Sequence, residues 1–236
     1  MKQLVLTPRL QLLADWVRPG TRFADVGTDH AYLPVWLRLQ GRVTTAIASD
    51  LRKGPLERAR ETGRFYGVDG IEYRLANGLA DIRPEEVDTI AIAGMGGETI
   101  AAILEAAPWT ADGFHTILLQ PMTHAPDLRR HLMEHGYQII REALVRDRGT
   151  IYPVMEVTAG TCTLSLGQLF GGAKLLHDPL GDRYIIEQII RMQGAVAGLN
   201  RSAVPTDRER EKADRLRDIL TALLEMREEW RNANCP

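Results

Sequence analysis

The chain has 236 residues, of which 44% are hydrophobic and 25% charged, and its formal net charge is −2. This composition excludes a disordered or fibrous protein, and the length predicts one large domain with a smaller appendage. No apolar run reaches the roughly 18 residues of a membrane span, and no long apolar N-terminal run suggests a signal peptide, so we expect a cytoplasmic protein without a membrane partner.

The cysteine content agrees with a reducing compartment. Cys162 and Cys235 are the two cysteines, they lie far apart, and they form no CxxC pair. The sequence therefore predicts neither a disulfide framework nor a cysteine zinc site.

The chain opens with a predicted helix. Thr7 is a good N-cap residue, Pro8 suits the first helical position, and apolar residues then recur at helical spacing until Pro19 and Gly20 end the helix. From there to about residue 160, short apolar runs alternate with segments of helical length. The seven predicted strands are residues 22–26, 44–49, 71–75, 88–93, 115–120, 137–145 and 151–158.

The apolar runs around Ile47, Ile90 and Leu118 are continuous rather than alternating, which is typical of parallel strands covered on both faces. The last two strands are joined by a hairpin-sized connection, residues 147–150. We therefore expect a doubly wound α/β fold, with five parallel strands closed by an antiparallel pair at one edge.

After residue 160 the pattern becomes helical. Two long apolar stripes follow, and Asn200–Pro205 forms a short loop between them, after which Thr206 and Glu209 have the spacing of a capping box. The stripes predict an antiparallel helical hairpin packed as a small coiled coil. The stripe residues are Ile185, Ile189, Met192, Val196 and Leu199 in the first helix, and Leu216, Ile219, Leu220, Leu223, Met226 and Trp230 in the second. The predicted domains are residues 1–160 and 161–236.

The first strand runs into a tight turn at Gly27, where folds of this class bind nucleotide-like ligands. The second and third glycines of a dinucleotide-binding G-x-G-x-x-G motif are replaced by Asp29 and Tyr32. An acidic side chain in this turn repels a pyrophosphate, which disfavours NAD and FAD. S-adenosylmethionine has no phosphate and carries a positive sulfonium, so it is compatible with this turn.

Two further strand ends indicate a nucleoside ligand. Asp50 closes the second strand, at the distance from Gly27 at which an acidic residue accepts hydrogen bonds from ribose hydroxyls. Asn77 and Gly78 follow the third strand, where a polar side chain next to a glycine suits an adenine ring. The alternative interpretation is structural, with Asp25 tying down loop amides, Asp50 capping a helix and Asn77-Gly78 forming a turn.

The fourth strand ends in a glycine-rich segment, Gly94-Met95-Gly96-Gly97, which brings backbone close to a ligand. This segment lacks the Asn-Pro-Pro-aromatic motif with which many amino-group methyltransferases hold an exocyclic amine. A ring nitrogen is therefore the better methyl acceptor. The alternative interpretation is a flexible loop before a helix.

Four segments in this order resemble the bacterial TrmK family of S-adenosylmethionine-dependent tRNA (adenine-N1)-methyltransferases, which act on adenosine 22. The segments are Asp25–Pro34 (DVGTDHAYLP), Lys53–Pro55 (KGP), Ala93–Gly97 (AGMGG) and Leu119–Pro121 (LQP). The resemblance covers essentially the whole chain and implies a class I, Rossmann-like methyltransferase domain, whose seven-stranded sheet agrees with the predicted strands. The C-terminal hairpin is then interpreted as a tRNA-positioning element.

Carried over by position, the resemblance implies a cofactor site for S-adenosylmethionine and a catalytic role for Asp29. The implied and candidate cofactor residues are Asp25, Gly27, Thr28, Asp29, Asp50, Asn77, Gly78 and Gly94. Two positions depart from the family pattern, because Asn77 stands where the family often has Asp and Asp50 where it often has Glu. Both residues retain hydrogen-bonding capacity.

Methylation at N1 of adenine requires that the base be turned out of a folded tRNA, and side chains near the strand ends must receive it. The candidates are His30, Tyr32, Met95 and Pro121. For Tyr32 a packing role is the alternative, and for His30 a local role at the start of a helix.

Contacts with tRNA phosphates must come from local patches, because the net charge attracts no polyanion and residues 161–236 hold eleven basic and eleven acidic residues. The densest basic stretch is Arg52, Lys53, Arg58, Arg60 and Arg64. On the hairpin the candidates are Arg208, Arg210, Lys212, Arg215 and Arg217. The alternative is a solvated helix face with ion pairs between residues four apart.

No metal site is expected, since His131 and His135 are four residues apart but have no evident third ligand. Three other functions remain open. They are methylation of another RNA position or of a small molecule, noncatalytic RNA binding, and nicotinamide-dependent reduction, which Asp29 disfavours.

Overall fold

The computed structural model describes residues 3–199 and 206–234, which form two compact units. The first contains the residues up to Arg141 together with Val145–Cys162, and the second contains Glu142–Leu144 and the chain from Thr163 onward. No helix among the described residues is long and apolar enough to cross a membrane. Each unit has its own core and is described separately.

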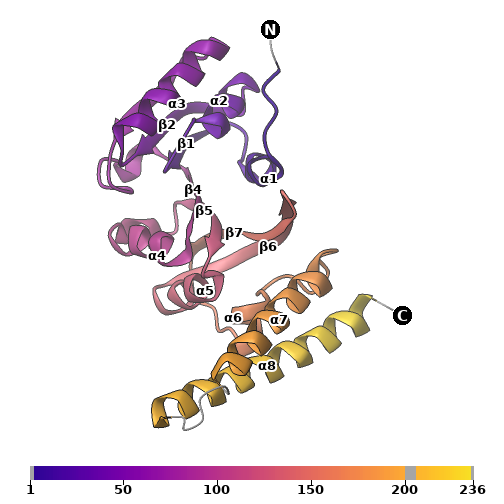
Figure 1. The fold of residues 1–236 in the computed structure, drawn as a ribbon. Coiled ribbons are helices and arrows are strands. Elements are labelled where there is room, and N and C mark those ends of the chain that lie inside the picture. Colours follow the sequence, from indigo (N-terminus) through magenta and orange to yellow (C-terminus); the bar gives the residue numbers. More distant parts are fainter. Residues whose placement is uncertain (1–2, 200–205, 235–236) are drawn as a thin grey trace. The chain divides into compact units, whose positions relative to one another are not determined.

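The first unit is built on a seven-stranded sheet in the order β3-β2-β1-β4-β5-β7-β6. The strands are β1 Thr21–Val26, β2 Val43–Asp50, β3 Ile71–Leu75, β4 Thr89–Gly96, β5 Thr116–Thr123, β6 Tyr137–Asp147 and β7 Thr150–Ala159. The first five are parallel and β7 runs antiparallel to β5. The predicted sheet is therefore confirmed, including the closing pair at one edge (Figure 1).

Helices connect the strands as expected for a doubly wound fold. They are α1 Pro8–Trp16, α2 Tyr32–Leu39, α3 Lys53–Tyr66, α4 Gly97–Glu105 and α5 Ala125–Glu134, with short 3₁₀ turns η1 Pro84–Glu86 and η2 Pro108–Ala111. From β1 the chain moves toward β3 and later returns to β4 and β5 on the other side of β1. Because such crossovers are right-handed, α2 and α3 cover one face of the sheet and α4 covers the other.

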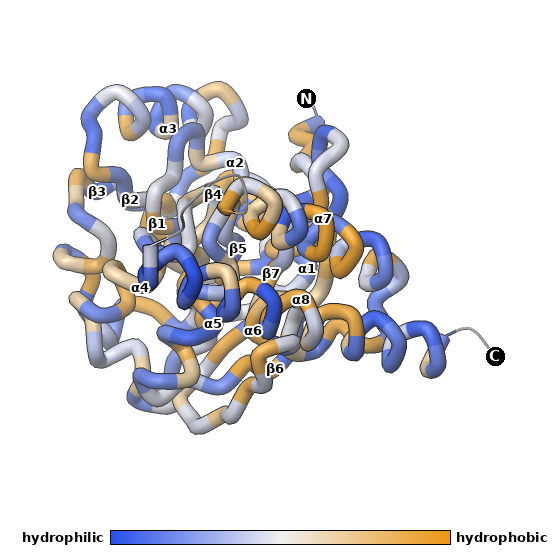
Figure 2. The backbone as a smooth tube through the Cα atoms, turned by 60° about the horizontal axis from the view of Figure 1, so that its bottom comes forward, coloured by the Kyte–Doolittle hydropathy of each residue, from blue (hydrophilic) through white to orange (hydrophobic). Residues whose placement is uncertain are grey.

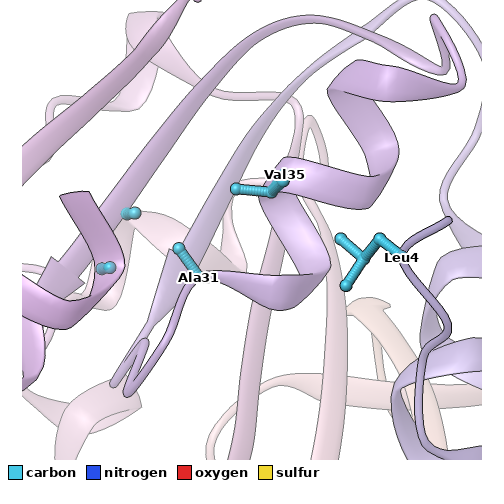
Figure 3. Packing of buried hydrophobic residues seen from close by; sticks show 5 residues of the cluster. Leu4, Ala31 and Val35 are labelled. Carbon is cyan, nitrogen blue, oxygen red and sulfur yellow. The ribbon is translucent and has the colours of Figure 1, made fainter. Parts of the chain in front are cut away.

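The core of this unit explains the continuous apolar strands. Ile47, Ile90 and Leu118 are all buried, as predicted for strands with helices on both faces. Next to β2, Leu4 and Val35 belong to a buried cluster that also holds alanines of α3 and of the loop before α2 (Figure 3). This cluster ties the first helices to the sheet.

Local sequence signals set two boundaries. Thr7 precedes α1 as predicted, but its side chain makes no capping hydrogen bond, and its carbonyl oxygen instead accepts the Gln11 amide at 2.8 Å. Between β6 and β7 the hairpin turn consists of Arg148 and Gly149, with φ values of 49° and 88°. Two central residues with positive φ are the geometry that matches the twist of a two-residue hairpin.

The second unit is helical, with α6 Leu166–Gly171, α7 Gly181–Leu199 and α8 Asp207–Asn234. Helices α7 and α8 run antiparallel (Figure 1), and hydrophobic and hydrophilic segments alternate along α8 (Figure 2). Their shared core consists of buried Ile185, Ile189 and Leu223, surrounded by Phe170, Met192, Ile219, Leu220, Met226 and Trp230. The predicted stripes meet in this core, except for Val196, Leu199 and Leu216.

The structure adds a short third helix to the predicted hairpin. Helix α6 has a Ser165–Gln168 capping box and supplies Phe170 to the core. The predicted box before α8 is present, since Glu209 Oε2 accepts the Thr206 amide at 2.7 Å and Thr206 Oγ1 accepts the Glu209 amide at 3.3 Å. The predicted loop Asn200–Pro205 lies outside the described residues.

Candidate functional site

A cavity of about 420 Å³ opens at the carboxyl ends of β1 to β4. Its walls include Gly27 after β1, Asp50 at the end of β2, Asn77 and Gly78 after β3, and Met95 in β4. Strand β1 lies between β2 and β4, so the order in which successive parallel strands are added to the sheet reverses at this point. Ligands of open α/β sheets bind at such switch points, and the volume suits a small organic ligand.

Gly27 makes the sharp turn that opens the cavity. Its φ is +79°, and its amide donates to the Ser49 carbonyl at 2.8 Å, as does the Thr28 amide at 2.9 Å. A Cβ built at this position falls 1.9 Å from Met95 Cε. The backbone conformation thus favours glycine, and a side chain here would also displace the flexible end of Met95.

Asp50 presents a buried carboxylate to the cavity. Its Oδ1 accepts the Arg52 amide at 2.8 Å and lies 3.8 Å from Arg52 Nε. Within the described residues no side chain or backbone group donates to Oδ2. Asp50 therefore forms a local turn with Arg52. Arg52 itself is the N-cap residue of α3, so the alternative of Asp50 as a helix cap is not observed. The second oxygen of Asp50 remains available to hydroxyl donors of a ligand.

The third strand end offers a polar group beside a close backbone approach. Asn77 is exposed on the cavity wall, and Gly78 has a φ of +61°. A Cβ at Gly78 would lie 3.1 Å from Ile103 Cγ2, so this glycine brings the strand end against α4. The exposed Asn77 side chain beside this apolar contact suits the polar edge of a flat ring.

Helix α4 supplies an apolar wall that sequence reasoning missed. Thr99, Ala102, Ile103 and Ala106 line the cavity, and Leu51 adds a residue from the β2–α3 connection. The signal was present, because these α4 positions are spaced i, i+3, i+4 and i+7 and so share one helix face. That spacing alone does not reveal whether the face meets a ligand or the sheet.

Asp25, a predicted cofactor residue, is buried at the end of β1 and is absent from the cavity wall. Burial raises the pKa of its carboxyl group to about 6, and the charge of Asp50 acts in the same direction. Thr28 is also buried and absent from the wall. Neither side chain therefore lines the cavity.

Asp29, the predicted catalytic residue, is exposed beside this turn and pairs with Arg58 of α3. The Arg58 hydrogen bond is the main reason that the pKa of Asp29 lies below its ordinary value, and the charges of His30 and Arg52 act in the same direction. Asp29 is therefore a carboxylate at neutral pH. Sequence reasoning had placed Arg58 among phosphate contacts and did not identify this pair.

The predicted base contacts are brought together in part. His30 and Tyr32 stack with ring centroids 5.2 Å apart and an angle of 7° between the rings, and Tyr32 is 40% exposed. Met95 lines the cavity, whereas Gly94 is exposed and lies outside its wall. Pro121 is buried in β5, so its ring offers no open surface on which a base can stack.

The basic residues of α3 are all exposed, and they differ in their partners. Arg60 donates to the Tyr73 carbonyl at 3.0 Å and lies over the Tyr73 ring. Lys53 and Arg64 have no ion-pair partner within the described residues, and the acidic residues of α3 pair with none of these cations. On this helix the alternative of intrahelical ion pairs is therefore not observed.

On α8 the opposite holds. Three of the five predicted phosphate contacts form ion pairs within the helix. The pairs are Arg210–Asp207, Arg215–Glu211 and Arg217–Asp214. These contacts match the alternative interpretation of a solvated helix face.

Two histidine clusters lie away from the cavity. His131 and His135 stack with centroids 4.0 Å apart, and His135 Nδ1 lies 2.9 Å from the His131 carbonyl oxygen. Glu98, His124 and Asp127 bring three ligand-type atoms together on the surface, and all three side chains are exposed. Exposed clusters of this kind are common without a bound ion, and no residue of either cluster lines the cavity.

Comparison with known proteins points to one enzyme class. A methyltransferase-domain family model matches residues 6–155. The chain is 37% identical over 179 residues to the tRNA (adenine(22)-N(1))-methyltransferase of Bacillus subtilis, which is 72% of this chain and 75% of that protein.

Solved structures agree. The B. subtilis m1A22 tRNA methyltransferase TrmK has a TM-score of 0.86 at 32% identity, covering 95% of this chain and 99% of that one. A Streptococcus pneumoniae protein crystallised in complex with S-adenosyl-L-methionine has a TM-score of 0.82 at 32% identity, covering 94% and 99%.

Proposed function

Because the chain belongs to the family of bacterial tRNA (adenine(22)-N1)-methyltransferases, we propose that it transfers a methyl group from S-adenosylmethionine to N1 of adenosine 22 in the D arm of tRNA. The observation that carries this proposal is the cavity at the switch point of the sheet, bordered by an acidic turn in place of a phosphate-binding one. The product is the m1A modification of tRNA.

The cavity residues fit S-adenosylmethionine. Asp50 Oδ2 is available for ribose hydroxyls, and Asn77, Gly78 and the apolar face of α4 suit the adenine ring. Gly27 allows close approach of the methionine part of S-adenosylmethionine, which carries the sulfonium. When bound, S-adenosylmethionine supplies an electrophilic methyl group whose positive sulfonium is compatible with the nearby carboxylates. We assign Asp25 and Thr28 to support of the turn, and Gly94 to close backbone approach beside Met95.

Positioning is the main catalytic task of the protein. The N1 atom of adenine has a free lone pair at neutral pH, so the chain need not remove a proton before the bond forms. As the ring gains positive charge its N6 protons become more acidic, and the Asp29 carboxylate accepts a hydrogen bond from N6 and stabilises that charge. The lowered pKa of Asp29 keeps this acceptor ionised.

The flipped base needs a platform, and the stacked pair of His30 and Tyr32 provides one beside Asp29. Aromatic faces stack on bases in a way that tolerates their identity. Met95 lines the cavity itself. With Pro121 buried, these three residues and Asp29 form the acceptor side of the site.

We assign tRNA phosphate contacts to the exposed cations of α3 and a tRNA-positioning role to the C-terminal helices. This extends the division into a catalytic domain, residues 1–160, and a helical domain, residues 161–236. We also place the protein in the cytoplasm, where tRNA is modified, and its two cysteines without a CxxC pair agree with a reducing compartment.

The decisive experiment incubates the protein with unmodified tRNA and labelled S-adenosylmethionine, followed by primer extension across the D arm. A stop at adenosine 22 is the expected result, because a methyl group at N1 blocks Watson-Crick pairing. Label at another nucleotide retains the methyltransferase class and rejects the assigned position. Binding of S-adenosylmethionine without transfer to any RNA supports a small-molecule acceptor, and absence of cofactor binding supports noncatalytic RNA binding instead.

A further inference from the structure

The pairing of Asp29 with Arg58 joins the β1–α2 turn to α3, two residues after the cavity residue Gly27. We propose that Arg58 is a positioning residue, which orients the Asp29 carboxylate toward the acceptor base. The inference rests on the proposed function and deepens it. It assigns Arg58 to the catalytic step instead of to a phosphate contact.

The position of Arg58 on α3 sends its side chain toward the site. A Cβ built at Gly54 would lie 3.8 Å from Arg58 Nη1, so the guanidinium folds back over the first turn of the helix. Long helical side chains lean toward the N-terminus in this way. The N-terminus of α3 follows the cavity residues Asp50 and Arg52, and Arg58 Nη2 donates from there to Asp29 Oδ1.

The contact leaves the carboxylate with one committed oxygen and one available oxygen. Oδ1 accepts from Arg58, whereas Oδ2 lies 3.6 Å from His30 Nε2, beyond hydrogen-bond distance. The Asp29 side chain is 60% exposed. Since His30 stacks on Tyr32, the available oxygen is adjacent to the proposed base platform.

The buried core keeps the two partners at a fixed separation. Ala31 lies two residues after Asp29, and Ala59 follows Arg58 directly. Both alanines belong to one buried cluster, in which they are 1% and 0% exposed; Figure 3 shows Ala31 within this cluster. An exposed ion pair by itself loses much of its attraction to side-chain freedom. Anchoring of both backbones reduces that freedom and gives the pair a defined geometry.

The neighbouring cations do not contact Asp29. Arg52, which precedes α3, faces Asp50, and Arg60 faces the Tyr73 ring and carbonyl. Lys53 and Arg64 form no ion pair within the described part of the chain. Among the described side chains, Arg58 is the cation that contacts Asp29 directly. The charges of His30 and Arg52 also lower the pKa of Asp29, so loss of Arg58 weakens the ionised state without abolishing it.

The test measures kcat, the KM for tRNA and the affinity for S-adenosylmethionine in Arg58→Gln, Arg58→Lys and Asp29→Ala. We expect Arg58→Gln to lower kcat by at least about fivefold, with KM and cofactor affinity within about twofold of the wild type. Arg58→Lys regains part of kcat, because it restores the charge without the planar fork. In the Asp29→Ala background, Arg58→Gln has no further effect on kcat.

The control is Arg83→Gln, which removes an exposed arginine that pairs with Glu85 and Glu86 before β4, at the opposite edge of the sheet. This variant is expected to match the wild type in all three measurements. A second readout is the ¹³C resonance of the Asp29 carboxyl group, whose titration moves upward in Arg58→Gln.

The outcomes separate the possible errors. A raised KM with unchanged kcat and a weaker salt dependence of tRNA binding identifies Arg58 as a phosphate contact and overturns the inference. So does a loss of kcat that persists in full without Asp29. A wild-type chain that methylates no tRNA overturns the proposed function and the inference together, whereas an active wild type with an unchanged Arg58→Gln overturns the inference alone.

Discussion

Asp25 and Asp29 are four residues apart, and the pKa values of their carboxyl groups are shifted in opposite directions. Burial raises the pKa of Asp25 to about 6, whereas Arg58 lowers the pKa of Asp29. At neutral pH both groups are ionised, but Asp25 carries its charge at a cost to folding and Asp29 does not. This contrast separates a residue that supports the turn from one that is available for chemistry.

Asp25 makes stability depend on pH. Its pKa is higher in the folded protein than the ordinary value of 3.8, so its favourable contribution is complete below pH 3.8 and is lost as the pH rises through about 6. Asp25→Asn removes this dependence. The unfolding free energy of the variant, relative to wild type, should therefore rise by about 3 kcal/mol across this window.

Urea unfolding between about pH 4.5 and 7.5, a range that contains about 2 kcal/mol of this rise, checks the difference. Asp88→Asn is the matched control, because Arg22 lowers the pKa of Asp88 and its titration lies below the measured window. Its difference from wild type should be flat. A flat difference for Asp25→Asn as well would show that Asp25 is not the buried acid described here.

Asp29→Ala tests the catalytic role separately from cofactor binding. The exposed carboxylate lies outside the cavity wall, so S-adenosylmethionine affinity should change little, whereas methyl transfer should fall by about a hundredfold through loss of charge stabilisation. Calorimetric titration and single-turnover kinetics give the two values. Asp15→Ala, an exposed change on α1, is the control. Unchanged turnover in Asp29→Ala would reduce Asp29 to a loop residue.

At the scale of elements, the start of α4 is held by a contact that admits no side chain. A Cβ at Gly97 would lie 2.2 Å from the carbonyl oxygen of His124, the residue before α5. Because backbone atoms cannot move aside as a flexible side chain does, Gly97→Ala must shift α4, which forms the apolar wall of the cavity. We expect a loss of about 1–3 kcal/mol in unfolding free energy and weaker cofactor binding.

Gly54→Ala is the companion change, since its Cβ meets only an ordinary contact in helix α3. Alanine is the better helix former, so this variant should equal or exceed the wild type by up to about 1 kcal/mol. Thermal unfolding and cofactor titration of both variants provide the comparison. Equal stability of Gly97→Ala and wild type would show that the α4–α5 junction is looser than the structure indicates.

The strands were predictable because the buried ones consist of continuous runs of apolar residues. Ile47 and Ile90 stand in such runs, and the observed strands contain them with ends displaced by no more than three residues. Helix α6 was missed because six residues show too little periodicity to distinguish a helix from a loop. Its position depends on Phe170 packing against α7 and α8, which is a tertiary contact.

The residues of the site likewise divide into those that the sequence predicts and those that it does not. Gly27, Asp50 and the Asn77-Gly78 pair were predictable because each follows a strand, and parallel strands end at one edge of the sheet. The wall formed by α4 and the Arg58–Asp29 pair depends on how each helix is rotated on the sheet. That rotation is set by side-chain packing between distant segments and has no local signature in the chain.

For the whole molecule, charge determines where a polyanion binds. The net charge of −2 gives no general attraction to tRNA, and residues 161–236 are balanced at eleven basic and eleven acidic residues. Affinity must come from cations that are free to replace counterions on phosphates. Lys53 and Arg64 of α3 meet this requirement among the described residues, whereas Arg210 and Arg217 of α8 already pair with neighbouring carboxylates.

Salt dependence of tRNA binding distinguishes the two sets. Each cation that contacts a phosphate contributes about one unit to the slope of log affinity against log salt concentration, so Lys53→Gln and Arg64→Gln should each lower the slope by about one. Arg210→Gln and Arg217→Gln should lower it by less, because the loss of either cation frees an acidic neighbour and releases few counterions. Filter binding from about 50 to 250 mM salt provides the slopes. A larger reduction of the slope for the α8 variants would show that the main phosphate contacts lie on α8 and not on α3. In that case tRNA phosphates would replace the carboxylates as partners of the α8 arginines, although the net charge of the helical unit is near zero.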